Sequence, residues 1–303
     1  MVCLVQRADR RSRRSHHVFF SRWPESKGMG GWLTSCEIAH AVADQPEGPY
    51  EMRGTALAPR PGQWDASTCH NPHIQRIGDR YALFYMGASN GRTNTKRIGL
   101  ATAPSLDGPW TRSDQPLLLP GPEGAWDDHC TTNPALVLRP NGEYWLYYKS
   151  WNTADYLRDE PPIRGNRKYG VAISRELTGP YKKHPENPVV DFSSLGDNRQ
   201  CEDAYVWFEN GLFRMIVRDM GVFNHEVGLI LESNDGVQWS SPEVAYLAAE
   251  NYIDLPPAPP HLRRYGRFER PQLLMRNGRP WHLFTAAQGG RANTASGFVF
   301  RID

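Results

Sequence analysis

A strand–turn–strand unit that occurs four times is the feature of this sequence that most restricts its fold. The four copies are residues 70–87, 132–150, 202–219 and 269–286. In each copy two apolar runs of strand length flank a turn that contains glycine: Gly78-Asp79, Asn141-Gly142, Asn210-Gly211 and Asn277-Gly278. Such pairs accept the positive φ of a tight turn, so each copy is predicted to be a β-hairpin.

The spacing of the copies predicts a repeat architecture. Taking Asn71, Asn133, Asp203 and Arg270 as equivalent positions, successive copies lie 62, 70 and 67 residues apart. A third apolar run follows the hairpins at 98–110, 169–181, 227–239 and 297–303, and residues 16–24 and 37–50 repeat the second and third runs at the front of the chain. We therefore predict an all-β fold, a five-bladed β-propeller that forms a single domain.

The first blade departs from this pattern. Its innermost strand is expected near residue 6, where the sequence VQRADRRS is rich in arginine and poor in apolar residues. Either this strand is missing, which leaves an open edge or a cleft, or the natural start lies upstream of Met1. We expect a first blade that is degenerate at its inner strand, a basic, disordered tail at residues 1–15, and a catalytic propeller domain at residues 16–303.

Charge and hydropathy exclude several classes of partner. The net charge is +2, and the basic residues cluster only within residues 7–14, so we expect no nucleic-acid partner. No run approaches the ~18 apolar residues of a membrane span, and no signal-peptide core follows the basic N-terminus. We expect no membrane partner and a cytoplasmic location for the chain as written, or an exported form if the start lies upstream. The sequence gives no oligomeric state.

The cysteines predict neither disulfides nor a metal site. The chain has five, an odd number, widely spaced and without a CxxC motif. Cys69-His70, His129-Cys130 and Cys201 fall near predicted strand starts, but their spacing is not that of a zinc site. We expect reduced thiols, no metal and no cofactor.

Polar residues gather at one end of the predicted inner strands. In a propeller the first strand of every blade lines the central axis, and the second strand runs back to the same end. The first-strand starts are His70, Asn71, Thr132, Asn133, Glu202, Asp203, Glu269 and Arg270, and the second-strand ends are Arg22, Trp23, Lys149, Arg218, Asp219 and Gln288. The opposite ends are apolar or form turns, which favours a ligand site over simple strand caps.

A Trp-Asp pair precedes two of these strands. Trp64-Asp65 precedes Asn71 by the spacing at which Trp126-Asp127 precedes Asn133. Each aspartate either binds sugar hydroxyls, acts as a base, or holds its loop in an Asx-turn. The sequence leaves these alternatives open.

Carboxylates that face one another are the means by which glycosidases cleave: one donates a proton, and the other, ionised, activates water or attacks carbon. The neighbouring charge of Asp203 is expected to raise the pKa of Glu202, so we predict that Glu202 is the general acid. Glu269 lies beside Arg270 and is expected to stay ionised. Asp127, Asp65, Asp203 and Glu269 all remain candidates for the base.

The chain resembles the five-bladed propeller glycoside hydrolases related to families 43, 32 and 117. The residues that carry this resemblance are SRWP (21–24), HNP (70–72), the TNP segment with its Trp-Asp pair, the GPW and GPY turns, CEDAYVW (201–207) and ERPQL (269–273). The resemblance implies three axial carboxylates that serve as base or nucleophile, as modulator and as acid. The sequence departs from the family-43 pattern, because Gln6 to Asp9 and His70-Asn71 stand where an aspartate opens the inner strands. A histidine at this axial position is similar to what is seen in the anhydro-sugar group. This resemblance implies that His70 takes part in acid–base catalysis.

We therefore expect an exo-acting glycosidase that cleaves an oligosaccharide or glycoside by carboxylate acid–base catalysis in the axial pocket, with loops 87–97, 150–168 and 286–296 closing its mouth. The expected catalytic residues are Glu202, Asp127, Glu269, His70 and Asp203. The expected substrate-binding residues are Arg22, Trp23, Asp65, Asn71, Thr132, Asn133, Lys149, Arg218 and Arg270. Two alternatives are a non-catalytic carbohydrate-binding propeller and a phosphate-dependent phosphorylase, in which Arg22, Lys149, Arg218 and Arg270 would hold the anion.

Overall fold

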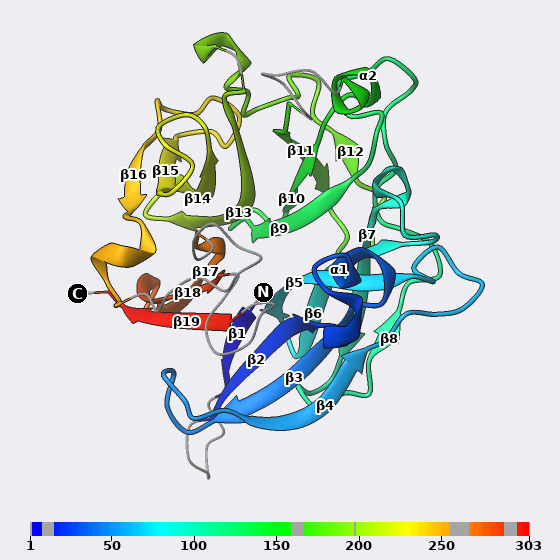
Figure 1. Ribbon diagram of the computed structural model, residues 1–303, viewed down its shortest axis with the longest axis vertical. Coiled ribbons are helices and arrows are strands. Elements are labelled where there is room, and N and C mark those ends of the chain that lie inside the picture. Colours follow the sequence, from blue (N-terminus) through cyan, green and yellow to red (C-terminus); the bar gives the residue numbers. More distant parts are fainter. Residues whose placement is uncertain are drawn as a thin grey trace. The chain divides into compact units, whose positions relative to one another are not determined.

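The strands of this protein form antiparallel sheets of sequence-consecutive strands (Figure 1). The computed structural model describes residues 2–7, 15–158, 166–196, 198–254, 267–287 and 296–302. Within them the strands make five sheets, four with four strands and one with three. The fold is the predicted all-β, five-bladed propeller, and each predicted hairpin supplies the first two strands of a blade.

The bounds of the strands follow the repeat. The first blade is β1 (Val2–Arg7), β2 (Ser15–Arg22), β3 (Glu37–Ala43) and β4 (Glu51–Leu57). The second is β5 (Thr68–Ile77), β6 (Arg80–Ala88), β7 (Arg97–Ala103) and β8 (Thr111–Arg112). The third is β9 (Thr132–Leu138), β10 (Tyr144–Ser150), β11 (Lys168–Ser174) and β12 (Lys182–Lys183). The fourth is β13 (Gln200–Glu209), β14 (Leu212–Met220), β15 (Gly228–Ser233) and β16 (Glu243–Tyr246), and the fifth is β17 (Glu269–Arg276), β18 (Arg279–Ala287) and β19 (Ser296–Arg301).

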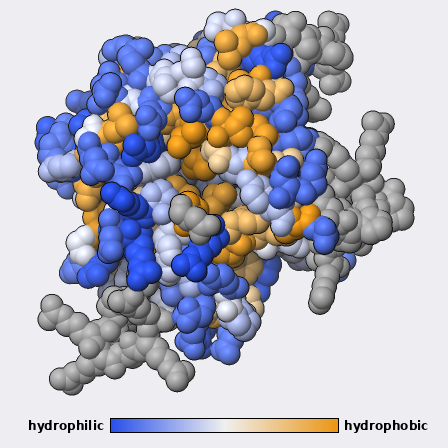
Figure 2. Space-filling model, turned by 90° about the vertical axis from the view of Figure 1, so that its left-hand side faces the viewer, coloured by the Kyte–Doolittle hydropathy of each residue, from blue (hydrophilic) through white to orange (hydrophobic). Residues whose placement is uncertain are grey.

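Helices in the described residues are short and lie in connections. They are α1 (Gly31–Thr34), α2 (Thr153–Leu157) and the 3-10 turns η1 (Glu25–Lys27), η2 (Thr93–Thr95), η3 (Ser193–Leu195) and η4 (Ala249–Asn251). No helix in this part of the chain is long and apolar enough to cross a membrane. On the face drawn in Figure 2, apolar patches lie among hydrophilic side chains.

The first blade has an inner strand, so of the alternatives left open by the sequence the one in which this strand is missing does not hold. Strand β1 pairs with β2 along its whole length, from Val2 opposite Phe20 to Arg7 opposite Ser15. The strand begins earlier than expected because the apolar run VCLV precedes the arginine-rich stretch that we assigned to a tail. Residues 8–14 of the predicted tail lie outside the described residues.

The four equivalent positions of the repeat share a left-handed backbone. The φ angles of Asn71, Asn133, Asp203 and Arg270 are 54°, 51°, 66° and 58°. The strand register shifts around the first three of them, so each marks a bulge at the start of an inner strand. Asparagine and aspartate tolerate this conformation better than other non-glycine residues, which explains their recurrence.

The chain divides into two compact units, where the sequence predicted one domain. Unit 1 is Met1–Pro116, Gln272–Ala286 and Gly297–Asp303, and unit 2 is Leu117–Pro271 and Ala287–Ser296. In unit 1, Phe19, Leu83 and Tyr85 are central to the packing between the first two blades. In unit 2, Tyr147 and Phe213 are buried in the corresponding core between the third and fourth blades. The predicted site residues belong to both units, and each group is described by itself.

Candidate active site

Seven ionisable side chains form one network in unit 2, which we call the charged cluster. Its members are Lys149, Arg167, Glu202, Asp203, Arg218, Glu269 and Arg270. They come from the end of β10, the segment before β11, the start of β13, the end of β14 and the start of β17. The strand ends that the sequence predicted to meet therefore do meet within this unit.

Glu202 is the hub of the charged cluster. Its carboxylate lies 2.7 Å from Lys149 Nζ, 2.9 Å from Arg167 Nε and 3.0 Å from Arg218 Nη1. Although burial by itself raises the pKa of Glu202, these three cations and the Arg270 guanidinium hold it well below the usual range. Glu202 is therefore ionised in this state, and the predicted raised pKa is wrong. The sequence argument counted only the adjacent Asp203, whereas the cations come from distant parts of the chain.

Asp203 has the opposite electrostatic environment. Its side chain is fully buried, contacts the Arg270 guanidinium and accepts a hydrogen bond of 2.5 Å from Asn133 Nδ2. Burial raises the pKa of Asp203, and the charges of Glu202 and Glu269 add to this effect. The opposing attraction of Arg270 does not cancel it, so the carboxyl of the pair whose pKa is raised is Asp203 rather than Glu202.

Arg218 joins Glu202 to a more exposed carboxylate. Its Nη1 atom lies 3.0 Å from Glu202 Oε1 and 2.6 Å from Glu269 Oε1. The side chain of Glu269 is 41% exposed, whereas those of Arg218 and Glu202 are 8% and 11% exposed. Glu269 therefore lies at the solvent side of the cluster.

An aromatic side chain lies against the cations. Lys149 Nζ and the Arg167 guanidinium lie 5.6 Å and 5.7 Å from the centre of a ring of Trp151. Burial lowers the pKa of Lys149, opposed by the attraction of Glu202 and Asp203. The Trp151 ring is itself only 3% exposed and packs against the rings of His129 and Tyr156, so it supports the cations from inside the unit.

Three residues in unit 2 bear on the predictions: Thr132, Arg167 and Asp219. Thr132 is buried and donates a hydrogen bond to Asn133 Oδ1, so it orients the amide that binds Asp203. Arg167 contacts Glu202 directly, but the sequence argument missed it because it follows a long loop and has no counterpart in the repeat. Asp219 accepts hydrogen bonds from five consecutive backbone N–H groups, at residues 221–225, and so holds a loop rather than a ligand.

The contacts of the Trp-Asp pairs favour the loop-holding alternative for Asp65 and Asp127. Each carboxylate is buried and accepts a hydrogen bond of 2.8 Å from a tyrosine of its own blade, Tyr85 or Tyr148. Asp127 also pairs with Lys183 at 2.5 Å. In the other unit, Asp65 pairs with two arginines. With these partners, both carboxylates anchor a loop onto a sheet.

The packing of the tryptophans explains a glycine in each third strand. A Cβ atom at Gly170 would lie 2.8 Å from Trp126, and one at Gly99 would lie 2.5 Å from Trp64. The tryptophan ring therefore occupies the space that a side chain would need. Because the same arrangement occurs in both blades, the Trp-Asp pair and this glycine form one packing motif.

In unit 1, His70 lies in a pocket of aromatic and sulfur groups. Its Nδ1 atom is 3.2 Å from Cys36 Sγ, and its ring lies 6.0 Å and 5.6 Å from rings of Trp23 and Trp32. Burial raises the pKa of the Cys36 thiol to about 12, so the thiol is protonated. Asn71 is buried nearby, and its backbone N–H donates to Ser21 Oγ.

Arg22 does not join this group. Its guanidinium pairs with Glu37 on the adjacent strand and donates to Thr55 Oγ1, and its side chain is 42% exposed. The predicted substrate-binding role of Arg22 therefore finds no support in its contacts, because the side chain lies along the outer surface of its own sheet. Gln288, predicted at a second-strand end, lies outside the described residues.

Sequence comparisons find distant relatives. No protein-family model matches the chain. It is 27% identical over 141 residues to an uncharacterised protein of Mycobacterium tuberculosis, and the aligned region covers 44% of each chain. It is 25% identical over 221 residues to a probable arabinan endo-1,5-alpha-L-arabinosidase A of Aspergillus oryzae, which covers 56% of this chain and 65% of the relative. The chain thus matches less than two thirds of the length of these relatives.

Solved structures of glycoside hydrolases share the fold. A family 117 glycoside hydrolase of the marine bacterium Zobellia galactanivorans matches 94% of this chain and 79% of its own, with a TM-score of 0.65 and 19% identity. A family-43 enzyme of Xanthomonas citri, solved with xylose, matches 99% of this chain and 85% of its own, with a TM-score of 0.63 and 14% identity. The predicted resemblance to propeller glycoside hydrolases is confirmed at the level of the fold.

Proposed function

We propose that this protein is a glycoside hydrolase that binds a sugar at the charged cluster of unit 2 and hydrolyses it by carboxylate catalysis. The observation that carries the proposal is the opposite perturbation of two neighbouring carboxyls: the pKa of Glu202 is lowered and that of Asp203 is raised. Glycoside hydrolysis needs one ionised and one protonated carboxyl at neutral pH. The propeller fold of the glycoside hydrolases described above supports the same function.

We assign the ionised role to Glu202 and the proton-holding role to Asp203. Glu202, with some exposed surface, would activate water or stabilise the positive charge that develops at the anomeric carbon. Asp203 has no exposed side-chain surface, so its proton becomes available only when Arg270 moves aside as the sugar binds. Glu269 and Arg167, at the solvent side, would contact sugar hydroxyls. Exo action stays part of the proposal, to be tested by whether products are released from one chain end.

The test compares two variants on two kinds of substrate. Asp203→Asn should lower hydrolysis of natural glycosides by about 10²–10⁴-fold, the usual contribution of proton transfer, and lose far less with aryl glycosides whose leaving group needs no proton. Glu202→Gln should lose activity on both. If Asp203→Asn is equally impaired on both substrates, or Glu202→Gln retains activity on aryl glycosides, the assigned roles are wrong.

A carbohydrate-binding propeller without catalysis is the second candidate. The observation in its favour is that Glu202 is held by three cations in a compact, fully paired arrangement. Binding of oligosaccharides without turnover of any glycoside in a broad panel would establish it. The phosphorylase alternative is not favoured, because Arg22, Lys149, Arg218 and Arg270 each already contact a carboxylate.

A further inference from the structure

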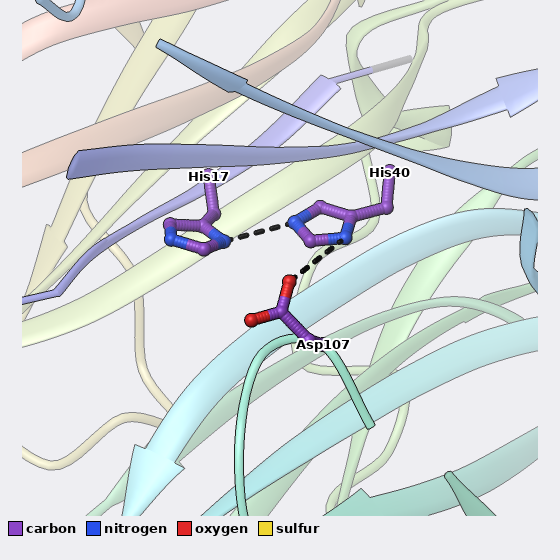
Figure 3. Close-up of side chains that lie close together, drawn as sticks. All are labelled: His17, His40 and Asp107. Atoms are coloured by element: carbon purple, nitrogen blue, oxygen red, sulfur yellow. Dashed lines mark hydrogen bonds and ion pairs between the residues drawn. The ribbon is translucent and has the colours of Figure 1, made fainter. Parts of the chain in front are cut away.

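Three side chains that can bind a metal lie together in unit 1, and none belongs to the charged cluster. They are His17 in β2, His40 in β3 and Asp107 in the turn between β7 and β8 (Figure 3). Because His40 is paired in register with Phe19, two residues beyond His17, both imidazoles lie on one face of the first sheet. One donor atom from each of the three side chains lies within 4.8 Å of the others.

The orientation of the rings resembles that of metal ligands. The two imidazole rings face each other (Figure 3), and His17 Nδ1 lies 2.9 Å from His40 Nε2. The other nitrogen of His17 lies 3.1 Å from Ser15 Oγ, and the other nitrogen of His40 lies 4.0 Å from Asp107 Oδ1. Metal-binding histidines usually direct their second nitrogen to an acceptor, which fixes the ring and the tautomer, and Ser15 Oγ has this place beside His17. Asp107 is instead the third candidate ligand.

The burial of the three groups also suits a metal. His17 and His40 are 3% and 5% exposed, whereas the Asp107 side chain is 58% exposed. The imidazoles therefore lie in a dry environment, and the carboxylate at the solvent edge leaves an entry path.

We propose that His17, His40 and Asp107 bind a divalent transition-metal ion, with Zn²⁺ preferred and water as the fourth ligand. Imidazole favours zinc over magnesium or calcium, which take oxygen ligands. Ligands about 2.0–2.1 Å from a tetrahedral ion lie ~3.3 Å apart, so the histidine pair must open slightly and the exposed carboxylate must move inward. The ion would tie two strands of the first blade to a turn of the second, both within unit 1.

The test uses Co²⁺, which gives visible absorption bands in a tetrahedral protein site, on the full chain freed of metal by a chelator. One equivalent of Co²⁺ should bind with such bands, Zn²⁺ should displace it, and Mg²⁺ should not. Zn²⁺ should also raise the melting temperature, because it binds the folded state. Absence of the bands and of the rise in melting temperature in the wild-type protein would overturn the proposal.

Variants connect the signal to these residues. His40→Gln should abolish the bands, and His184→Gln, which removes a histidine of the other unit, should leave them intact. Asp107→Asn changes an exposed side chain and should fold normally, so it carries the test if His40→Gln does not fold. It should weaken Zn²⁺ binding by about 10-fold or more. Unchanged affinity in Asp107→Asn, or intact bands in His40→Gln, would show that the metal binds elsewhere.

Discussion

The charge state of Glu202 can be measured through stability. If Glu202 is ionised, Glu202→Gln removes the negative charge that compensates buried Lys149 and Arg218 while keeping the shape of the side chain. Breaking a buried ion pair by neutralising one partner costs about 3–5 kcal/mol. If Glu202 were protonated at pH 7, as the sequence argument expected, the amide would be close to isosteric and isoelectronic and the cost would be small.

The assay is thermal unfolding of the wild type and Glu202→Gln at pH 7 and at lower pH. For a chain of this size we expect the variant to melt about 6 °C or more below the wild type at pH 7. Because the folded-state pKa of Glu202 lies below its unfolded value, its contribution is fully present above the unfolded pKa of about 4.3. This contribution to stability is lost only as the pH falls from the unfolded pKa through the folded pKa. The difference in melting temperature between the wild type and Glu202→Gln should therefore persist at pH 5.5.

The control is Glu269→Gln, which removes a more exposed carboxylate that pairs with Arg218. Exposed ion pairs contribute about 1 kcal/mol or less, so this variant should melt close to the wild type. A cost of less than about 1 kcal/mol for Glu202→Gln at pH 7 would refute the argument that Glu202 is the ionised hub.

Three further predictions follow from other contacts. Asp127→Asn should lower the free energy of unfolding by about 2 kcal/mol with kcat nearly unchanged in the folded fraction, and a large loss of kcat would return Asp127 to the catalytic candidates. Gly170→Ala should cost about 1–3 kcal/mol because its Cβ meets Trp126, whereas Gly30→Ala, whose Cβ meets nothing closer than 3.9 Å, should cost far less; equal melting temperatures would contradict the packing motif. Cys36, with a pKa of about 12, should resist iodoacetamide in the native protein at pH 8 and react on unfolding, as mass spectrometry would show.

The fold was predictable because its signals are local and repeated. The residues of each hairpin turn, such as Asn210-Gly211, predict the turn conformation by themselves. Four copies at similar spacing then predict the blades of a propeller. The inner strand of the first blade was missed because its apolar run, residues 2–5, is short and adjoins arginines. Tertiary pairing with β2 decides that such a run becomes a strand.

The membership of the charged cluster was largely predictable, but its electrostatics were not. The starts of the first strands identified Glu202 and Asp203, and the ends of the second strands identified Arg218, without knowledge of their contacts. The pKa of Glu202 depends on distances to groups that come from other strands and from a loop, as Arg167 does. Sequence adjacency is a poor guide to electrostatics because a pKa responds to what lies within a few ångströms in space.

The left-handed bulge at the start of inner strands β5, β9 and β13 has a consequence for how such proteins diversify. The backbone at Asn71, Asn133 and Asp203 restricts the residue to one that tolerates positive φ, and asparagine and aspartate satisfy this about equally. Their codons differ by one base. A lineage can therefore exchange a neutral amide for an acid at any of these three positions by a single nucleotide change, and so acquire or discard a carboxylate at a strand start while the backbone stays as it was.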